Sequence, residues 1–160
     1  MGVAAHPHRE RQRVLLTGLL PDITTDPAIE TAIDSVEAGR SGTIVAPVGI
    51  RPPLLAAVAS RAATPLVVLT ATGRDAESLT NALASWIPGV AMLPAWETLP
   101  HERLSPQVDT MARRIAVLRR LVHPIKGDDS AGPISVLVVP IRAFLQPIIS
   151  GLADLEPVRV

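Results

Sequence analysis

The sequence predicts an α/β domain with a parallel sheet of about four strands and helices on both faces. Apolar runs of strand length alternate along the chain with segments of helical periodicity, the order expected of βαβ units. The run PLVVLTAT, residues 65–72, is almost continuously apolar, as expected for a strand covered on both faces. Hydrophobic residues make up 48% of the 160 residues, which is enough for one domain with a real core.

The first half of the chain is expected to hold two helices and one further strand. The segment 24–42 predicts a helix that Thr25 or Asp26 caps and that Gly39 ends. TIVAP, residues 43–47, is a short β-branched run that predicts a buried strand. The segment 52–63 then predicts a helix, because it begins with two prolines and continues with small apolar residues.

The segment after residue 72 predicts a helix and then a strand. Ala76, Leu79, Leu83 and Trp86 recur every three or four residues, which is the pattern of an amphipathic helix. Its start resembles a capping box, with Thr72 followed three residues later by Asp75. VAMLPA, residues 90–95, predicts the next strand.

The last third of the chain predicts a long helix, a fourth strand and a short helix. Residues 134–140 (ISVLVVP) predict the strand, and residues 141–149 predict the short helix. The long helix is expected to begin at Ser105 and Pro106, a good N-cap and first-turn pair. One stripe recurs at helical spacing and is expected to face the core: Val108, Met111, Ile115, Leu118 and Val122.

The composition limits the compartment and the class of function. With 15 basic and 15 acidic residues the net charge is zero, which argues against non-specific nucleic-acid binding by the whole domain. The sequence has no cysteine, which excludes disulfides, thiolate zinc sites and thiol catalysis. No apolar run approaches the roughly 20 residues that cross a bilayer, so the expected location is the cytoplasm. The expected division is a flexible leader at 1–21, an α/β domain at 22–150, and at 151–160 the start of a connection to a downstream module.

The loop after the first predicted strand is the natural place for a phosphate site in such a fold. A P-loop needs G-x-x-x-x-G-K-[S/T], in which backbone N–H groups, the lysine and the hydroxyl hold the phosphates and magnesium. Here only Gly49 remains of the glycines, and Arg51 stands about where the lysine would be. Pro52 and Pro53 also remove two N–H donors. The loop therefore resembles a degenerate P-loop, and no bound cofactor is expected on this chain.

A second candidate site is the segment LPAWETLPHERLSP, residues 93–106. Glu97, His101 and Glu102 offer two carboxylates and an imidazole, which could serve acid/base chemistry or bind a metal. Pro100 lies between them, however, and no second cluster is visible to complete such a site. The favoured interpretation has no catalytic residue and no metal, with the segment acting as a structural or interaction loop.

The same segment and the helix after it resemble the N-terminal region of bacterial transcription-repair coupling factors, most closely the actinobacterial members. The runs on either side, residues 65–83 and 136–148, agree with that resemblance, which covers roughly residues 20–160. The family pattern is W-E-T-L-P-[Y/H]-[E/D]-x-x-S-P-x-x-D. Here its residues are Trp96, Glu97, Thr98, Leu99, Pro100, His101, Glu102, Ser105, Pro106 and Asp109.

The resemblance implies a helicase-like, RecA-like fold similar to the first domain of the repair protein UvrB, with a phosphate loop that no longer holds ATP. The complete family protein is an ATP-driven DNA translocase that displaces stalled RNA polymerase and recruits UvrA for nucleotide-excision repair. ATP and magnesium serve its downstream motor, and UvrA, RNA polymerase and duplex DNA are bound mostly by downstream domains. Because the sequence has no D-E-x-H box and no complete Walker motif, we expect a non-catalytic N-terminal fragment or the product of a truncated gene.

Two other functions remain open at this point. The chain could be a small nucleotide-binding or hydrolytic α/β domain that uses Arg51 and Glu97. It could instead contact DNA through the arginines of the long helix, although no aromatic residues lie between them as in a single-strand-binding surface. Those arginines are Arg113, Arg114, Arg119 and Arg120.

Overall fold

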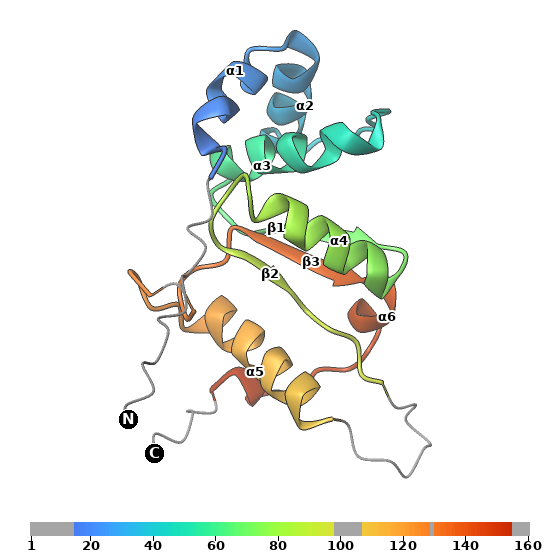
Figure 1. Ribbon diagram of the computed structural model, residues 1–160, viewed down its shortest axis with the longest axis vertical. Helices are drawn as coiled ribbons and strands as arrows, with labels where there is room; N and C mark the ends of the chain where they lie inside the picture. Colours follow the sequence, from blue (N-terminus) through green and yellow to red (C-terminus); the bar gives the residue numbers. More distant parts are fainter. Residues whose placement is uncertain (1–14, 98–106, 129, 155–160) are drawn as a thin grey trace, which may run out of the picture.

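Three parallel strands form the sheet of the computed structural model, which describes residues 15–97, 107–128 and 130–154. They are β1 (Leu66–Thr70), β2 (Val90–Met92) and β3 (Val136–Pro140), arranged in the order β1-β3-β2. Figure 1 shows the sheet between two groups of helices, as predicted from the alternating pattern. The number of strands was predicted wrongly, since three are described rather than about four.

One face of the sheet packs against the helix α4, and the other helices of the first half of the chain extend the same core beyond it. Val136 and Val138 of β3 are fully buried there, together with Ala76 and Leu83 of the helix α4. Each large apolar side chain buried in this way stabilises the fold by roughly 1.5–3 kcal/mol. The helices of this group are α1 (Leu20–Thr24), α2 (Pro27–Glu37), α3 (Arg51–Arg61) and α4 (Gly73–Leu83).

The other face packs against α5 (Val108–Val122) and α6 (Ile141–Phe144). Leu137 and Val139 of β3 point to this side, because successive strand residues face opposite sides of a sheet. With Val136 and Val138 on the first face, every residue of β3 is buried, which explains its continuously apolar sequence.

Helix starts in the first half follow the predicted capping chemistry. Asp26, not Thr25, is the N-cap of α2, and its carboxylate accepts hydrogen bonds from the N–H groups of Ala28 and Ile29. Thr72 caps α4 by accepting from the N–H of Asp75 at 3.1 Å. Gly39 lies just past the end of α2 with φ +66°, a backbone conformation that favours glycine.

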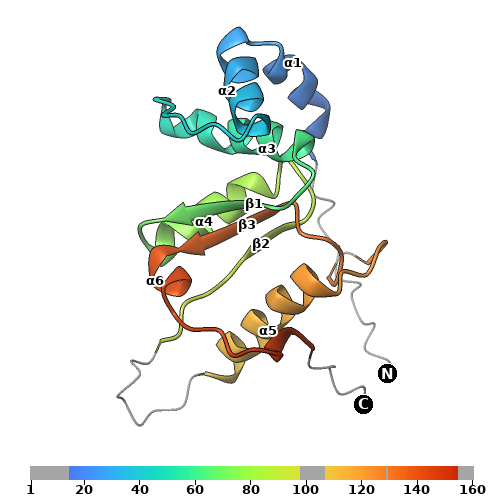
Figure 2. The same cartoon turned by 180° about the vertical axis from the view of Figure 1, so that it is seen from behind.

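The prediction of a strand at residues 43–47 was wrong for this structure. The segment is extended but pairs with no described strand, and Ile44 and Val45 are 55% and 96% exposed. It runs alongside α3, as Figure 2 shows from behind. A β-branched run becomes a strand only when a neighbouring strand satisfies its backbone groups, and here none lies beside it among the described residues.

The face that α5 buries also differs from the predicted stripe. Thr110, Arg114, Val117 and Leu118 are buried, whereas the other predicted core positions are half-buried or exposed. The helix is therefore turned by about one residue from the orientation that its apolar pattern suggests. Its exposed apolar side chains include Val108 at 80%, Met111 at 39% and Val122 at 55%.

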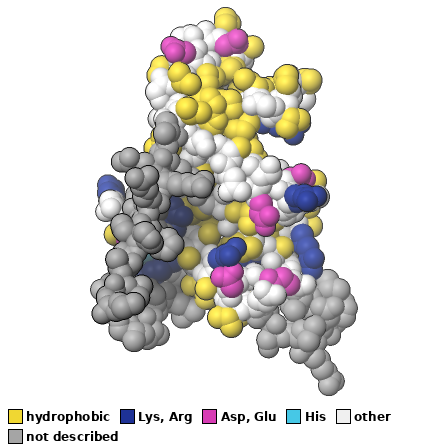
Figure 3. Space-filling model, viewed as in Figure 1, with side chains coloured by type: hydrophobic (Ala, Val, Ile, Leu, Met, Phe, Trp, Pro, Cys, Tyr) yellow, Lys and Arg dark blue, Asp and Glu magenta, His cyan; other side chains and the backbone are white. Residues whose placement is uncertain are grey.

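Residues just before 22 have regular structure, although the sequence predicted none. Thr17–Leu19 form a short 3-10 helix (η1), and Leu20 at the start of α1 is buried against the first core. The N–H of Leu16 donates to the carbonyl of Ser85 at 2.7 Å. Hydrophobic side chains gather over this end of the molecule, around α1, α2 and α3 (Figure 3). Residues 1–14 lie outside the described residues, and the division into leader and domain stays a prediction.

Candidate functional site

The signature segment begins where β2 ends, and the structure describes its first two residues. Trp96 and Glu97 follow β2 by a few residues, and Asp109 lies in the first turn of α5. The other predicted signature residues lie outside the described parts of the chain: Thr98, Leu99, Pro100, His101, Glu102, Ser105 and Pro106. The proposed grouping of Glu97 with His101 and Glu102 therefore stays a prediction.

The backbone of Trp96 is held by a side chain that lies 50 residues away in the sequence. Its N–H donates to Oε1 of Gln146 at 2.7 Å, and Nε2 of Gln146 donates to its carbonyl at 3.3 Å. One amide side chain thus satisfies both backbone groups of Trp96, as a neighbouring strand would. A weaker contact of 3.4 Å joins Nη2 of Arg142 to the carbonyl of Glu97. The chain after β2 is thereby fixed to the segment after β3.

Arg114 of α5 is the most unusual residue of this region, because its side chain is charged and only 1% exposed. Its Nη1 donates to the carbonyl of Pro94 at 2.6 Å, and its guanidinium lies 4.5 Å from the centre of the Trp96 ring. Its Nε is buried without a hydrogen-bond partner among the described atoms. Burial lowers the pKa of Arg114, because the charged form loses water. The described partners are thus a carbonyl and an aromatic ring, an arrangement that suits a planar guanidinium.

Glu97 uses both carboxylate oxygens at the start of α5. Oε2 accepts from the N–H of Gln107 at 3.2 Å, and Oε1 accepts a hydrogen bond from the hydroxyl of Thr110. A carboxylate at a helix N-terminus is favourable, since it meets N–H groups that lack a partner within the helix and the positive end of the helix dipole. Glu97 therefore caps the N-terminus of α5, although it lies 10 residues before Gln107 in the sequence.

Together these contacts form what we call the signature clasp, defined by Trp96, Glu97, Thr110, Arg114 and Gln146. It joins the exits of β2 and β3 to one face of α5. The hydroxyl of the clasp, on Thr110, donates to its carboxylate, on Glu97, which also accepts from the N–H of Gln107, so both groups are engaged at the start of α5. Across the described parts of the chain, no group of three metal-binding side chains occurs. What the arrangement can do is orient α5.

Sequence reasoning missed three members of the clasp. Thr110 and Arg114 are four residues apart, the spacing that places two side chains on one helix face, and this was the available signal. An arginine in an amphipathic helix is usually expected to face solvent, so the sequence led to a wrong prediction for the environment of Arg114. Gln146 gave no signal, because nothing in a single sequence links it to Trp96.

The predicted degenerate phosphate loop leads into α3. Gly49 lies in a short 3-10 helix, η2 (Val48–Ile50), and Arg51 is the exposed first residue of α3. A Cβ added at Gly49 would meet nothing within 4 Å, so neither close packing nor a positive φ requires glycine here. Pro52 and Pro53 occupy the first turn of α3, where an anion would need N–H donors.

The four arginines of α5 do not share one exposed face. Arg113 is exposed and pairs with Asp109 at 2.8 Å, one turn earlier. Arg114 belongs to the clasp and, being buried, offers no surface to DNA. Arg120 is half-buried and donates through Nε to the carbonyl of Gly132 at 2.8 Å, while Arg119 is also half-buried. A DNA contact through the remaining arginines stays a prediction.

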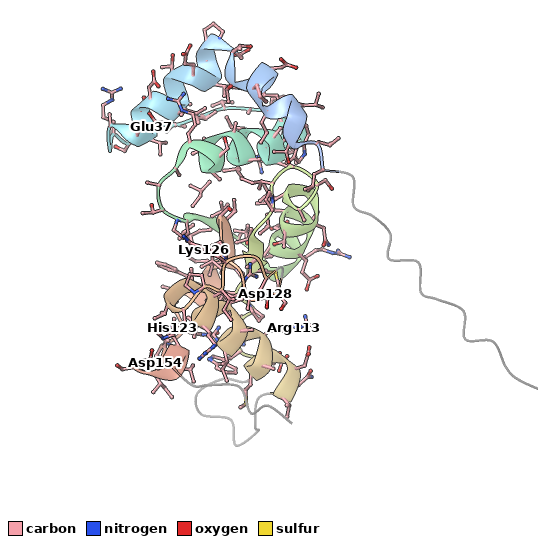
Figure 4. All side chains as sticks on the ribbon, turned by 90° about the vertical axis from the view of Figure 1, so that its left-hand side faces the viewer. Glu37, Arg113, His123, Lys126, Asp128 and Asp154 are labelled. Carbon is pink, nitrogen blue, oxygen red and sulfur yellow. The ribbon has the colours of Figure 1, made fainter. Side chains whose placement is uncertain are left out.

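A cavity of about 310 Å³ lies away from the clasp. Pro65 and Ser135, which precede β1 and β3, line it together with Arg120. It therefore lies at the amino ends of the strands, whereas ligands of open α/β sheets bind beyond the carboxyl ends. At the end of α5, Nε2 of His123 lies 2.7 Å from Oδ1 of Asp154, an exposed hydrogen bond that joins α5 to the 3-10 helix η3 (Leu152–Asp154) (Figure 4). Neither feature adds a chemical group to the clasp.

Comparison with known proteins gives a specific result. No family model matches the chain. The chain is 47% identical over 121 residues to the transcription-repair-coupling factors of Mycobacterium bovis and Mycobacterium tuberculosis. A more distant relative, the transcription-repair-coupling factor of Escherichia coli, is 30% identical over 94 residues, which are 58% of this chain and 8% of that protein.

The mycobacterial match covers 74% of this chain but only 9% of the length of either relative. No helix in the described residues has the length and apolar character needed to cross a membrane. The predicted resemblance to this family is thus confirmed by a match that covers about three quarters of the chain. The chain is homologous to one part of the mycobacterial transcription-repair-coupling factors.

Proposed function

We propose that this chain is a non-catalytic scaffold from the N-terminal region of a transcription-repair coupling factor, acting in the cytoplasm. The observation that carries the proposal is the use of Trp96 and Glu97, the two described residues that open the signature. Both are engaged in fixing α5 to the strand exits, and Glu97 has its two oxygens bound at the helix start. The most specific family mark therefore supports the architecture of the domain.

The parallel sheet supports a helicase-like domain similar to the first domain of UvrB, with a degenerate phosphate loop. The exposed Arg51 and the prolines after it supply none of the backbone cradle that a nucleotide would need. In this proposal ATP and magnesium belong to a motor elsewhere in the longer protein. UvrA, RNA polymerase and duplex DNA are likewise partners of the longer protein, reached mostly through other domains.

A chimera tests the proposal. In the coupling factor of Mycobacterium tuberculosis, the matched segment is replaced by the corresponding part of this chain. If this chain is the equivalent scaffold, the chimera should restore survival after ultraviolet irradiation to a strain that lacks its own coupling factor. A chimera that is expressed and folded but restores nothing would contradict the proposal.

The same chimera carrying Glu97→Ala should lose part of that survival, since α5 loses its distant cap. Asp109→Ala is the matched control, because it removes an exposed carboxylate from the first turn of the same helix. Equal survival in the Glu97 and Asp109 variants would show that the clasp is not needed for the function of the domain.

A further inference from the structure

The cavity at the amino ends of β1 and β3 has a volume of about 310 Å³ and lies away from the clasp. Its walls are the ends of α3 and α5, which lie on opposite sides of the sheet (Figure 2), and the residues that lead into the two strands. This volume is at the lower end of the range found for small-molecule sites. The cavity is therefore of the size that a small ligand fills.

Arg120 is the only charged residue among the described residues that line the cavity. Its side chain is half-buried, and its Nε donates to the carbonyl of Gly132 at 2.8 Å, which holds the guanidinium in place. Its two Nη groups have no acceptor in the described part of the chain. The carboxylate of Asp128 accepts from Ser130 and Ala131 instead. The cavity wall thus carries a cation to which no described carboxylate is paired.

The other polar groups of the wall are also able to donate hydrogen bonds. The hydroxyls of Thr64 and Ser135 have no partner among the described residues, and neither do the N–H groups of Ala63 and Thr64. No aspartate or glutamate is among the described lining residues. Free donors around a guanidinium suit the oxygen atoms of an anion.

The two helix ends at the cavity limit the charge of that anion. The C-terminus of a helix carries about half a negative charge, so the ends of α3 and α5 together offset much of the charge of Arg120. A doubly charged phosphate gains little from such a balanced field. A singly charged carboxylate gains more, because arginine binds it through two parallel hydrogen bonds.

The remainder of the wall is apolar and is held by prolines. Ala62, Leu121 and Ile134 supply aliphatic surface. Pro65 and Pro133 fix the backbone just before β1 and β3. A wall fixed in this way loses little conformational entropy when a ligand binds. A short aliphatic body on the ligand would bury this apolar surface.

We propose that the cavity binds a small aliphatic monocarboxylate. The carboxylate accepts from the Nη groups of Arg120, and the aliphatic body packs against the alanine and leucine side chains between α3 and α5. The site goes beyond the scaffold role, because it lies at the opposite ends of the strands from the clasp. A ligand bound here contacts helices from both sides of the sheet and so ties the end of α5 to the end of α3.

Titration of the chain with sodium isovalerate, followed by the NMR signals of the backbone amides, tests the site. Sodium chloride at the same concentrations is the blank. The amides of Thr64, Leu121 and Ser135 should shift and saturate together with a millimolar dissociation constant, because so small a ligand makes few contacts. Shifts that rise without saturating, or that match those in sodium chloride, would overturn the proposal.

Two variants change the site in different ways. Arg120→Gln removes the charge and should weaken isovalerate binding by about tenfold or more. Ala62→Leu leaves Arg120 in place but fills the cavity, and it should abolish the saturable shifts. The matched control is Arg113→Gln, at an exposed arginine of the same helix, and it should bind like the unchanged chain.

The dispersion of the amide signals shows whether each variant is folded. If Arg120→Gln does not fold, Ala62→Leu still decides the outcome. Unchanged binding in a folded Ala62→Leu variant would overturn the site, and equal affinity in the Arg120 and Arg113 variants would overturn the role assigned to the charge.

Two further probes test the class of ligand. Isopentanol has the same aliphatic body without the charge, and inorganic phosphate has the charge without the body. Both should bind more weakly than isovalerate. Equal binding of isopentanol would show an apolar cavity without an anion site, and tighter binding of phosphate would show an anion site of another class. Either result would contradict the proposal.

The outcomes for this site and for the scaffold role are independent. The titrations use the chain alone, whereas the scaffold role is tested by survival of the strain that carries the chimera. A chimera that fails to restore survival counts against the scaffold role and leaves the carboxylate site standing.

Discussion

At the scale of single residues, Arg114 is where sequence and structure differ most. An arginine buried to 1% exposure must satisfy a charged, planar group inside the domain. Its Nη1 donates to the carbonyl of Pro94 and its guanidinium lies over the face of Trp96, while its Nε has no partner among the described atoms. Arg113, its neighbour in the sequence, is exposed and pairs with Asp109. The two residues have the same chemistry and opposite environments, which makes them a matched pair.

Arg114→Ala should lower the free energy of unfolding by about 2–4 kcal/mol. It removes a charge-assisted hydrogen bond, the stacking on Trp96 and a buried aliphatic stem. Arg113→Ala should cost less than about 0.5 kcal/mol, because exposed ion pairs contribute little. Urea unfolding of both variants measures the difference. Equal losses would mean that the clasp does not hold the domain together.

Asp128 gives a prediction for pH at the same scale. Its Oδ1 accepts hydrogen bonds from the hydroxyl and the N–H of Ser130 and from the N–H of Ala131, at 2.7, 2.7 and 2.8 Å. The hydroxyl of Ser130 contributes most to lowering the pKa of Asp128. A lowered pKa stabilises the fold above the unfolded value, near 3.9, and this stabilisation is lost as pH falls through the folded pKa.

An NMR titration of the Asp128 carboxyl group should therefore have its midpoint below that of a free aspartate. In Ser130→Ala the midpoint should move upward, because the hydroxyl donor is gone. An unchanged midpoint in Ser130→Ala would show that this hydrogen bond does not hold the turn in solution.

At the scale of elements, the sequence predicted where helices and strands form better than how they face. The positions of α2, α3, α4 and β3 followed from local signals, namely caps, prolines, glycines and apolar runs. The orientation of α5 did not follow, because the clasp overrides the apolar stripe. The prediction of a strand at residues 43–47 was wrong for a related reason. A segment becomes a strand only beside another strand, and the local sequence does not show whether one is there. Helix limits are local properties, whereas orientation and pairing are properties of the packed domain.

Helix capping in α2 tests the local part of that statement. The sequence left Thr25 and Asp26 as alternatives, and in the structure Asp26 accepts the hydrogen bonds of the helix start. Asp26→Ala should lower the free energy of unfolding by about 1 kcal/mol. Thr25 donates only to the carbonyl of Asp22, so Thr25→Ala should cost less than half as much. Thermal unfolding compares the two variants, and a larger loss at Thr25 would reverse the assignment.

At the scale of the whole molecule, the fold class and the family resemblance were both available from the sequence. The parallel α/β architecture followed from the alternation of elements, and the relationship to coupling factors followed from the signature. The contacts that give the signature its role were not available, because they join segments as distant as Trp96 and Gln146. The resulting account is of a parallel α/β domain in which Trp96 and Glu97, the described residues that open the signature, fix α5 to the strand exits.

The central claim is that this domain is a scaffold without nucleotide chemistry, and calorimetry tests it most directly. ATP with magnesium is titrated into the chain, with Arg51→Ala as the matched variant. The account predicts no saturable heat up to millimolar ATP for either protein, because Pro52 and Pro53 remove N–H donors from the start of α3, where a phosphate would bind. Micromolar binding by the unmodified chain that Arg51→Ala abolishes would contradict it.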